Sequence, residues 1–346
     1  MYRFDDGRDS MAIKLVDYTT HGVVEAGMRA LQSVDQASEF TLRPMHVAVV
    51  SAPDSSVACS TDPGVPGVPG VPGVPGVPGV GRRNVGHDAF LYAYYTMALG
   101  GLSLSDFVEN NNVDITWKSV LAGLLDLFDA VARLNEQGIV HGDVKLENAI
   151  LHDGRFKLCD FDRVMRANAL VPGDGLPTVS DSFERIAGHS LAYYVYPPEY
   201  IALCLLYDPT FNVEDRSPVV VKRIHTQRMK WLRQRPGMPN LWMYPLGTDP
   251  LGTDPRPDPY QGWWNMVAAT AAAGKMHPAS GMRPGNTDAY GLGMALIRCR
   301  HASMPPPGRL LSEIDALIYH MTDWDFRSRW TAEMGAATLR RILAEI

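Results

Sequence analysis

The residues that most constrain the fold of this 346-residue chain are 141–162, which read HGDVKLENAILHDGRFKLCDFD. Two short apolar segments, NAILH and RFKLCDF, flank Asp153-Gly154, and an Asp-Gly pair in that setting predicts a β-hairpin with a tight turn. Asn148 stands at the start of the first strand, and Asp160 follows the apolar part of the second. A hairpin brings its outer ends together, so we expect Asn148 and Asp160 to lie close in space.

The same segment carries the side chains that phosphoryl transfer requires. That reaction needs a group that orients the acceptor hydroxyl, oxygen ligands for magnesium, and positive charge near the phosphates. Asp143 can accept or orient a hydroxyl proton, and Lys145 can stabilise the moving phosphoryl group. Asn148 and Asp160 supply oxygen ligands of the kind that Mg²⁺ prefers. The spacing therefore predicts catalytic roles for Asp143 and Lys145, and metal-ligand roles for Asn148 and Asp160.

The regions on either side differ in their predicted elements. Before residue 102 the pattern predicts strands at 2–4, 11–17, 46–52 and 89–101, with one helix at 23–34. Beyond it we expect mainly helices, at 116–138, 288–299, 310–321 and 331–346, and a short one that begins near Ser103. The helix at 116–138 is the clearest, because its apolar residues recur at helical spacing, and Gly138 supplies its end.

These motifs resemble those of the eukaryotic protein-kinase superfamily. HGDVKLEN is similar to the catalytic loop H-R-D-L-K-P-E-N, and CDFD is similar to the metal-binding D-F-G. AIK in MAIKLVD resembles the strand motif whose lysine holds the nucleotide phosphates, which implies that role for Lys14. Glu25 on the next helix would then be the ion-pair partner of Lys14. The resemblance further implies that ATP binds near residues 95–98, which are Tyr95, Thr96, Met97 and Ala98.

Three further matches carry structural roles in that family. YPPEY resembles the A-P-E motif, with Glu199 as its acidic residue. Asp288 in TDAYGLG resembles a buried aspartate that holds the catalytic loop. Arg329 in DWDFRSRW resembles the late arginine that pairs with the A-P-E glutamate.

The resemblance implies an α+β, bilobal, protein-kinase-like fold. Its truncated, β-rich N-lobe would comprise residues 1–98, and its mainly helical C-lobe residues 99–346. A Gly-Val-Pro repeat makes 53–88 a disordered, low-complexity insertion in the first lobe, because proline cannot donate to a sheet and glycine resists ordering. Residues 201–286 would form an irregular insertion in the second lobe.

Two kinds of acceptor remain open. HGD in place of HRD, and DFD in place of DFG, resemble the aminoglycoside and choline kinases, which act on small molecules. Lys145, the YPPE segment and Arg329 resemble protein kinases instead, and a lysine at position 145 favours serine/threonine over tyrosine acceptors. The resemblance therefore favours transfer of the ATP γ-phosphoryl group, with Mg²⁺, to a Ser or Thr hydroxyl of a protein.

A pseudokinase that binds partners without catalysis is the other alternative. Only 13 residues precede Lys14, and no glycine-rich phosphate loop lies among them. Either the start is set too far downstream or the N-lobe is short. Asp162 also replaces the family's glycine and adds negative charge beside the predicted metal site. Retention of Lys14, Asp143 and the predicted metal ligands favours an enzyme.

Net charge, cysteine spacing and the N-terminal sequence indicate the binding partners and the cellular compartment to expect. The net charge of −6 provides no basic field for nucleic acid or an anionic membrane. Four widely spaced cysteines predict reduced thiols, and the N-terminus has no apolar signal segment. We expect an intracellular, cytoplasmic protein without a membrane span; its oligomeric state is left open.

Overall fold

The computed structural model divides the chain into two compact units. Unit 1 comprises Met1–His21 and Pro44–Leu99, and unit 2 comprises Gly22–Arg43 and Gly100–Ile346. The residues that the structure describes are 2–5, 10–42, 44–52, 90–98, 101–109, 115–166, 195–207, 217–224, 264–265, 267–268, 285–302 and 308–346. The predicted insertion at 53–88 and most of the one at 201–286 lie outside these residues.

Unit 1 contains a four-stranded antiparallel sheet with the strand order β1-β2-β4-β3. Its strands are β1 (Tyr2–Asp5), β2 (Ser10–Asp17), β3 (Pro44–Ala52) and β4 (Phe90–Ala98). The two strands predicted at 2–4 and 11–17 are present and pair with each other, since Tyr2 lies opposite Ile13 and Asp5 opposite Ser10. β4 pairs with β2 and β3, so it is a central strand although it follows the repeat in sequence.

The helix α1 (Tyr18–Val34) is longer than predicted, and its residues from Gly22 onward belong to unit 2. Its end is fixed by a buried carboxylate. Asp35 accepts hydrogen bonds from the backbone N–H groups of Glu39, Phe40 and Thr41, at 2.7, 3.2 and 2.8 Å. This turn redirects the chain away from the helix.

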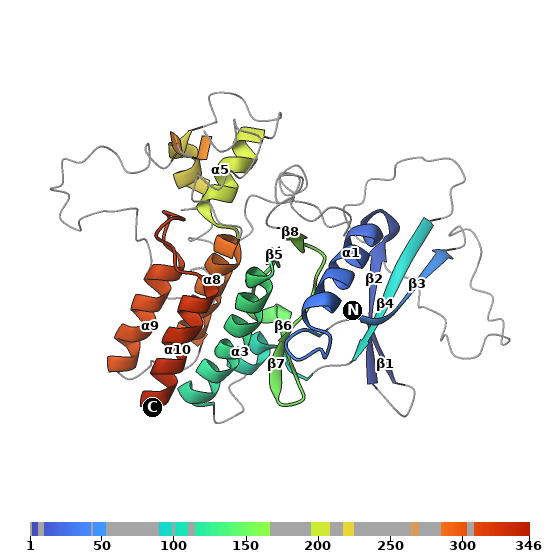
Figure 1. Cartoon of the computed structure of the whole chain (residues 1–346), viewed down its shortest axis with the longest axis horizontal. Helices are drawn as coiled ribbons and strands as arrows, with labels where there is room; N and C mark the ends of the chain where they lie inside the picture. The colour runs from blue at the N-terminus through green and yellow to red at the C-terminus, as the bar shows by residue number, and fades with distance from the viewer. Residues whose placement is uncertain are drawn as a thin grey trace. The chain divides into compact units, whose positions relative to one another are not determined.

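Unit 2 is mainly helical. Its helices are α1 from Gly22, α2 (Leu104–Glu109), α3 (Trp117–Glu136), α5 (Pro198–Tyr207), α8 (Gly285–Ala302), α9 (Gly308–Met321) and α10 (Ala332–Glu345) (Figure 1). Thr116 caps α3, because its hydroxyl accepts from Ser119 N while the Ser119 hydroxyl accepts from Thr116 N. With the sheet of unit 1, this content agrees with the predicted α+β class.

One part of the predicted irregular insertion is wrong. Residues 201–207 continue α5, because the sequence IALCLLY is apolar and helix-forming and buries Ile201, Ala202 and Leu205. Residues 218–224 also form a helical segment. The insertion therefore does not begin as irregular chain at 201.

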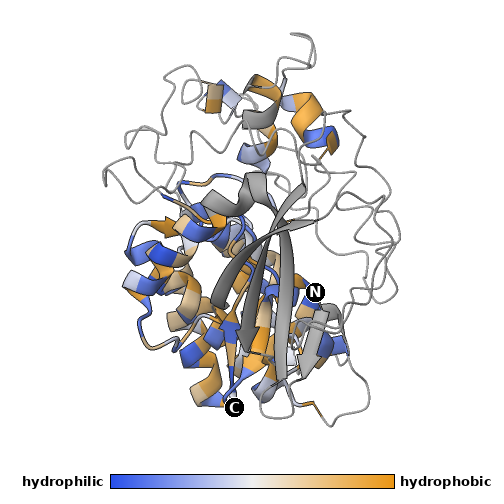
Figure 2. Ribbon diagram, turned by 90° about the vertical axis from the view of Figure 1, so that its right-hand side faces the viewer, coloured by the Kyte–Doolittle hydropathy of each residue, from blue (hydrophilic) through white to orange (hydrophobic). Residues whose placement is uncertain are grey.

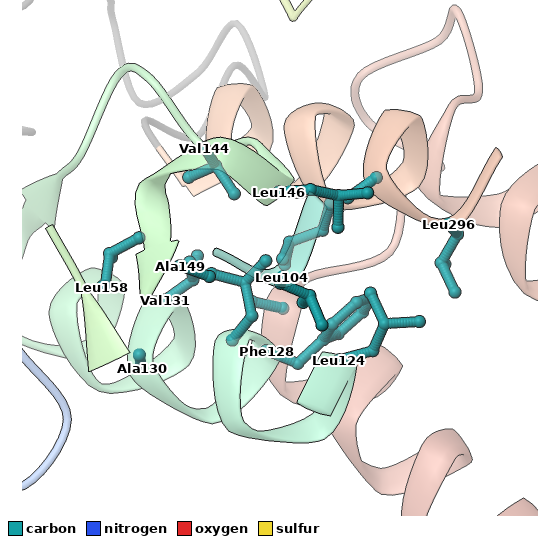
Figure 3. Close-up of a cluster of buried hydrophobic side chains, with 14 of the residues drawn as sticks. Leu104, Leu124, Phe128, Ala130, Val131, Val144, Leu146, Ala149, Leu158 and Leu296 are labelled. Carbon is teal, nitrogen blue, oxygen red and sulfur yellow. The ribbon is translucent and has the colours of Figure 1, made fainter. Parts of the chain in front are cut away.

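The core of unit 2 forms around α3. Leu121, Leu124, Phe128 and Val131 are almost fully buried, as the apolar stripe of this helix predicts. Figure 3 shows side chains from α2, α3 and α8 meeting those of the predicted catalytic loop and hairpin, among them Leu146. In Figure 2 hydrophobic and hydrophilic residues alternate along the helices of this unit, as expected for amphipathic helices. The loop with the candidate catalytic residues is thus built onto the main core.

Two short β-ribbons lie beside this core. β5 (Ile139–Val140) pairs with β8 (Met165–Arg166), and β6 (Ala149–His152) pairs with β7 (Arg155–Leu158). The chain passes between the units at 21/22, 43/44 and 99/100, and the unit 2 segments next to the last two connections extend the second ribbon. Residues 40–42 hydrogen-bond along β7, and residues 101–103 along β6. The chain next to these two connections is therefore anchored on the hairpin that the predicted metal ligands flank.

No helix among the described residues is both long and apolar enough to cross a membrane.

Candidate active site

The predicted hairpin is present and brings its two ends together. Asp153 and Gly154 have φ angles of +53° and +76°, which suit the tight turn that an Asp-Gly pair favours. Ala149 lies opposite Leu158, and beyond that pair Cys159 N donates to Asn148 O at 2.8 Å. Asn148 and Asp160 therefore lie at the same open end of the ribbon.

Asp143, Lys145 and Asn148 form one hydrogen-bonded group. Lys145 Nζ lies 2.9 Å from Asp143 Oδ2. Asn148 Nδ2 donates to Asp143 Oδ2 at 3.1 Å and to the Asp143 carbonyl at 2.9 Å. Asp143 and Asn148 are each only 5% exposed. The structure thus brings together three of the four residues that the sequence assigned to chemistry.

Asp160 lies next to this group and has a left-handed backbone. Its φ angle is +67°, an unusual value for a residue with a side chain. Such strained residues persist where the surrounding structure fixes them, and they cluster at functional sites. The backbone bond between Cys159 and Asn148 holds the chain just before Asp160.

A buried histidine links the loop to the residue before Asp160. His141 Nδ1 accepts from Asp143 N at 3.2 Å, so Nε2 carries the proton and donates to the Cys159 carbonyl at 3.1 Å. The ring also meets Phe161 edge-on, with 5.3 Å between the ring centroids. His141 therefore connects the backbone of Asp143 to the Cys159–Asp160 segment.

Asp288, at the start of α8, holds the backbone of the loop by hydrogen bonds. Its carboxyl group accepts from His141 N at 2.8 Å, Gly142 N at 2.9 Å and Asn135 Nδ2 at 2.9 Å. Complete burial raises its pKa; the electrostatic effect of His141 and the three hydrogen bonds oppose the rise, and the net shift of the pKa is upward.

The position of Gly142 requires a glycine. Its φ angle is +75°, and a Cβ there would lie 2.8 Å from the Arg163 carbonyl oxygen and 2.9 Å from the Met165 methyl carbon. The β5–β8 pairing brings these groups against it. Close backbone packing thus accounts for the glycine of HGD.

Glu199 and Arg329 form a buried bidentate ion pair. Arg329 donates to the two carboxylate oxygens at 2.5 and 3.0 Å, and both side chains are at most 1% exposed. Arg329 also donates to the carbonyls of Asn286 and Asp323, at 3.0 and 2.9 Å. The pair therefore ties α5 to the start of α8 and to the segment before α10.

The predicted nucleotide residues fall in different units. Lys14 lies on β2 opposite Tyr95 of β4, and Met11 lies opposite Ala98; Thr96 and Met97 are between them. Glu25 lies on α1 in unit 2, where it bonds Arg29 at 2.9 Å. The ion pair of Lys14 with Glu25, and the nucleotide-binding role of 95–98, remain predictions.

The side chains of Asn148 and Asp160 offer oxygen atoms of the kind that Mg²⁺ prefers as ligands. The side-chain nitrogen of Asn148 donates its hydrogen bonds to Asp143, so the side-chain oxygen Oδ1 is the atom that could bind a metal ion. Asp160 adds a carboxylate. Within the described part of the chain, no three His, Cys, Asp or Glu residues form a metal-binding cluster. An ion held by Asn148 and Asp160 would complete its shell with phosphate oxygens and water, as Mg²⁺ commonly does.

Two contributors were missed at the level of sequence. Asn135 bonds both Asp288 and the Ile139 carbonyl, and Arg298 reaches the loop from α8. An available signal was a polar or charged residue in an otherwise apolar helical stretch, as at Arg298 in GLGMALIRC.

No family model matches the sequence, and no curated protein matches it. Among solved structures, the chain is similar to that of the Legionella pneumophila LegK7 effector kinase, with 14% sequence identity and a TM-score of 0.47. The alignment covers 98% of this chain and 58% of the Legionella chain, so the chain spans less than two thirds of that protein's length.

Proposed function

We propose that this protein is a kinase that transfers the γ-phosphoryl group of ATP to a Ser or Thr hydroxyl of a protein. The observation that carries the proposal is the group formed by Asp143, Lys145 and Asn148, beside Asp160 and held by Asp288. A carboxylate, an ammonium and the two side chains proposed to hold the metal thereby lie together, in the loop before the hairpin and at its open end, as phosphoryl transfer requires.

Each residue then has a role in the transfer. The Asp143 carboxylate orients the acceptor hydroxyl and takes its proton as the acceptor oxygen bonds to the γ-phosphorus and the bond to the β-phosphate oxygen breaks. Lys145, now 2.9 Å from Asp143, lies where it can neutralise charge on the transferred group. Asn148 and Asp160 would hold Mg²⁺, which supplies charge neutralisation at the phosphates. Lys14 would bind the α- and β-phosphates, with Glu25 as its positioning partner.

The buried Glu199–Arg329 pair favours a protein acceptor over a small molecule. The YPPE segment and the late arginine were the motifs that distinguished protein kinases from aminoglycoside and choline kinases, and the two residues bond each other with both carboxylate oxygens.

Calorimetric titration of ATP, with and without Mg²⁺, tests the nucleotide half of this proposal. We expect Mg²⁺ to strengthen ATP binding in the wild type and to have little effect in Asp160→Asn, which keeps the shape of the side chain but removes its charge. An Asp162→Asn variant is the control, because it removes a neighbouring charge that the proposal gives no ligand role. Equal dependence on Mg²⁺ in all three proteins would contradict the assignment. A separate assay with γ-labelled ATP tests the acceptor. Label transferred to an amino-sugar or choline, and not to protein, would identify a small-molecule kinase.

A further inference from the structure

Arg298 makes three side-chain contacts, one with the candidate catalytic loop and two with α2. It lies in α8 and is 7% exposed. One guanidinium nitrogen donates to Glu147 Oε1 at 2.5 Å, and the other donates to Ser105 Oγ at 2.8 Å and to Glu109 Oε1. Arg298 thereby joins α8 to the loop, 151 residues away at Glu147, and to α2, 189 residues away at Glu109.

Glu147 is the middle residue of η1 (Leu146–Asn148), the single 3₁₀ turn that presents Asn148. Such a turn has little stability of its own, and no side chain caps its N-terminus. Leu146 anchors it to the core at 1% exposure, and the Asn148 amide bonds Asp143. Those two contacts fix the ends of the turn, and Glu147 with Arg298 fixes its middle.

We infer that Arg298 is a positioning residue of the proposed active site: through Glu147 it sets the orientation of η1, and so of the metal ligand Asn148. Its other contacts make it suited to that task. Ser105 and Glu109 hold the guanidinium on a second helix, so its two donating nitrogens are both directed, one toward η1 and one toward α2. A planar guanidinium can make these bonds in different directions at once, which a lysine ammonium on a flexible stem does not reproduce.

Arg300 provides a matched control on the same helix. Its side chain is 10% exposed, and it bonds both carboxylate oxygens of Asp315 on α9, at 2.6 and 3.2 Å. Replacing Arg298 or Arg300 by methionine removes the same charge and keeps an unbranched apolar stem. The two arginines have similar burial, but Arg298 bonds Glu147 of the loop, whereas Arg300 bonds Asp315 of α9.

The inference rests on the proposed function, and kinetics provide its first test. We expect Arg298→Met to lower kcat by about 10-fold to about 100-fold and to raise the Mg²⁺ concentration for half-maximal rate, because small misplacements of a reacting group are that costly. KM for the protein acceptor should change less than twofold. Arg298→Lys should recover only part of kcat, and Arg300→Met should keep both kcat and the Mg²⁺ requirement. Equal losses in Arg298→Met and Arg300→Met, or no loss in either, would overturn the inference.

Hydrogen exchange provides a test that does not depend on activity. In Arg298→Met the amides of residues 144–149 should lose protection relative to wild type, while in Arg300→Met they should not. If the wild type transfers no phosphoryl group, the proposed function fails, and this comparison still decides whether Arg298 fixes η1. Unchanged exchange of these amides in Arg298→Met would contradict the positioning role.

Discussion

Asp288 holds the backbone of Gly142: its Oδ1 accepts the Gly142 N–H at 2.9 Å, across 146 residues of sequence. The residue after Gly142 is Asp143, the proposed catalytic carboxylate. The backbone of the site is therefore held by a completely buried residue at the start of a core helix. Asp288 also accepts hydrogen bonds from His141 N and Asn135 Nδ2.

The tight packing at Gly142 predicts a large cost for a single methyl group. Gly142→Ala should lower the free energy of unfolding by about 2–4 kcal/mol, because it adds left-handed strain and an overlap with the Arg163 carbonyl. Gly154→Ala is the control, since Gly154 has a φ angle of +76° but no atom within 4 Å of the added carbon. It should cost only about 1–2 kcal/mol, for strain alone. Urea unfolding measures both values, and equal losses would show that the carbonyl contact is unimportant.

Asp288 predicts a pH dependence of stability. Because burial raises its pKa above 3.8, the folded protein binds this proton more tightly than the unfolded chain does. Its contribution to the free energy of unfolding is therefore complete below the unfolded pKa and is lost as pH rises through the folded pKa. The difference in unfolding free energy between wild type and Asp288→Asn should thus fall as pH rises from about 4. A difference that grows with pH would show that the three donors outweigh burial.

The Glu199–Arg329 pair should be costly to break from one side. Glu199→Gln leaves a buried guanidinium without its counter-charge and should destabilise the protein by about 3–5 kcal/mol. In a Glu199→Leu background the Arg329 charge has already lost its counter-charge. Adding Arg329→Met there should therefore lower the free energy of unfolding much less than Arg329→Met alone does. The exposed pair of Arg309 and Glu345 is the control, and Arg309→Met should cost less than about 1 kcal/mol. Similar effects at the two pairs would contradict the role of burial.

The Cys299 thiol should not react with alkylating reagents in the folded protein. It is 2% exposed, and burial raises the pKa of its thiol to about 12, although Arg298 opposes the shift. The reactive thiolate is then almost absent at pH 8. Iodoacetamide followed by peptide mass spectrometry should find Cys299 unmodified under native conditions and modified in denaturant. Rapid native modification would mean that α8 opens locally.

The parts of the structure that could be predicted from sequence are those set by local chemistry. The Asp153-Gly154 turn, the apolar stripe of α3 and the start of α2 at Ser103 each depend on a few neighbouring residues. The positions of Asn148 and Asp160 at one end of a ribbon followed from the hairpin alone.

Contacts between distant segments could not be derived in this way. Asn135 and Arg298 act through partners more than 150 residues away, and their spacing in sequence carries no trace of that pairing. The tie of residues 40–42 to β7 depends on the Asp35 turn, whose hydrogen bonds no periodicity reveals. The Glu199–Arg329 pairing was inferred only through resemblance to a family.

The most direct test of the account is a phosphotransfer assay that compares wild type with Asp143→Asn, using γ-labelled ATP, Mg²⁺ and a basic protein rich in Ser and Thr as acceptor. The account predicts Mg²⁺-dependent label on Ser or Thr in the wild type and a rate lowered by about 100-fold or more in the variant, since Asn keeps the shape but cannot accept the proton. Equal ATP affinity in the two proteins would show that the loss lies in the chemical step. A well-folded wild type that binds Mg²⁺ and ATP but labels no acceptor, or a variant that transfers at the wild-type rate, would contradict it.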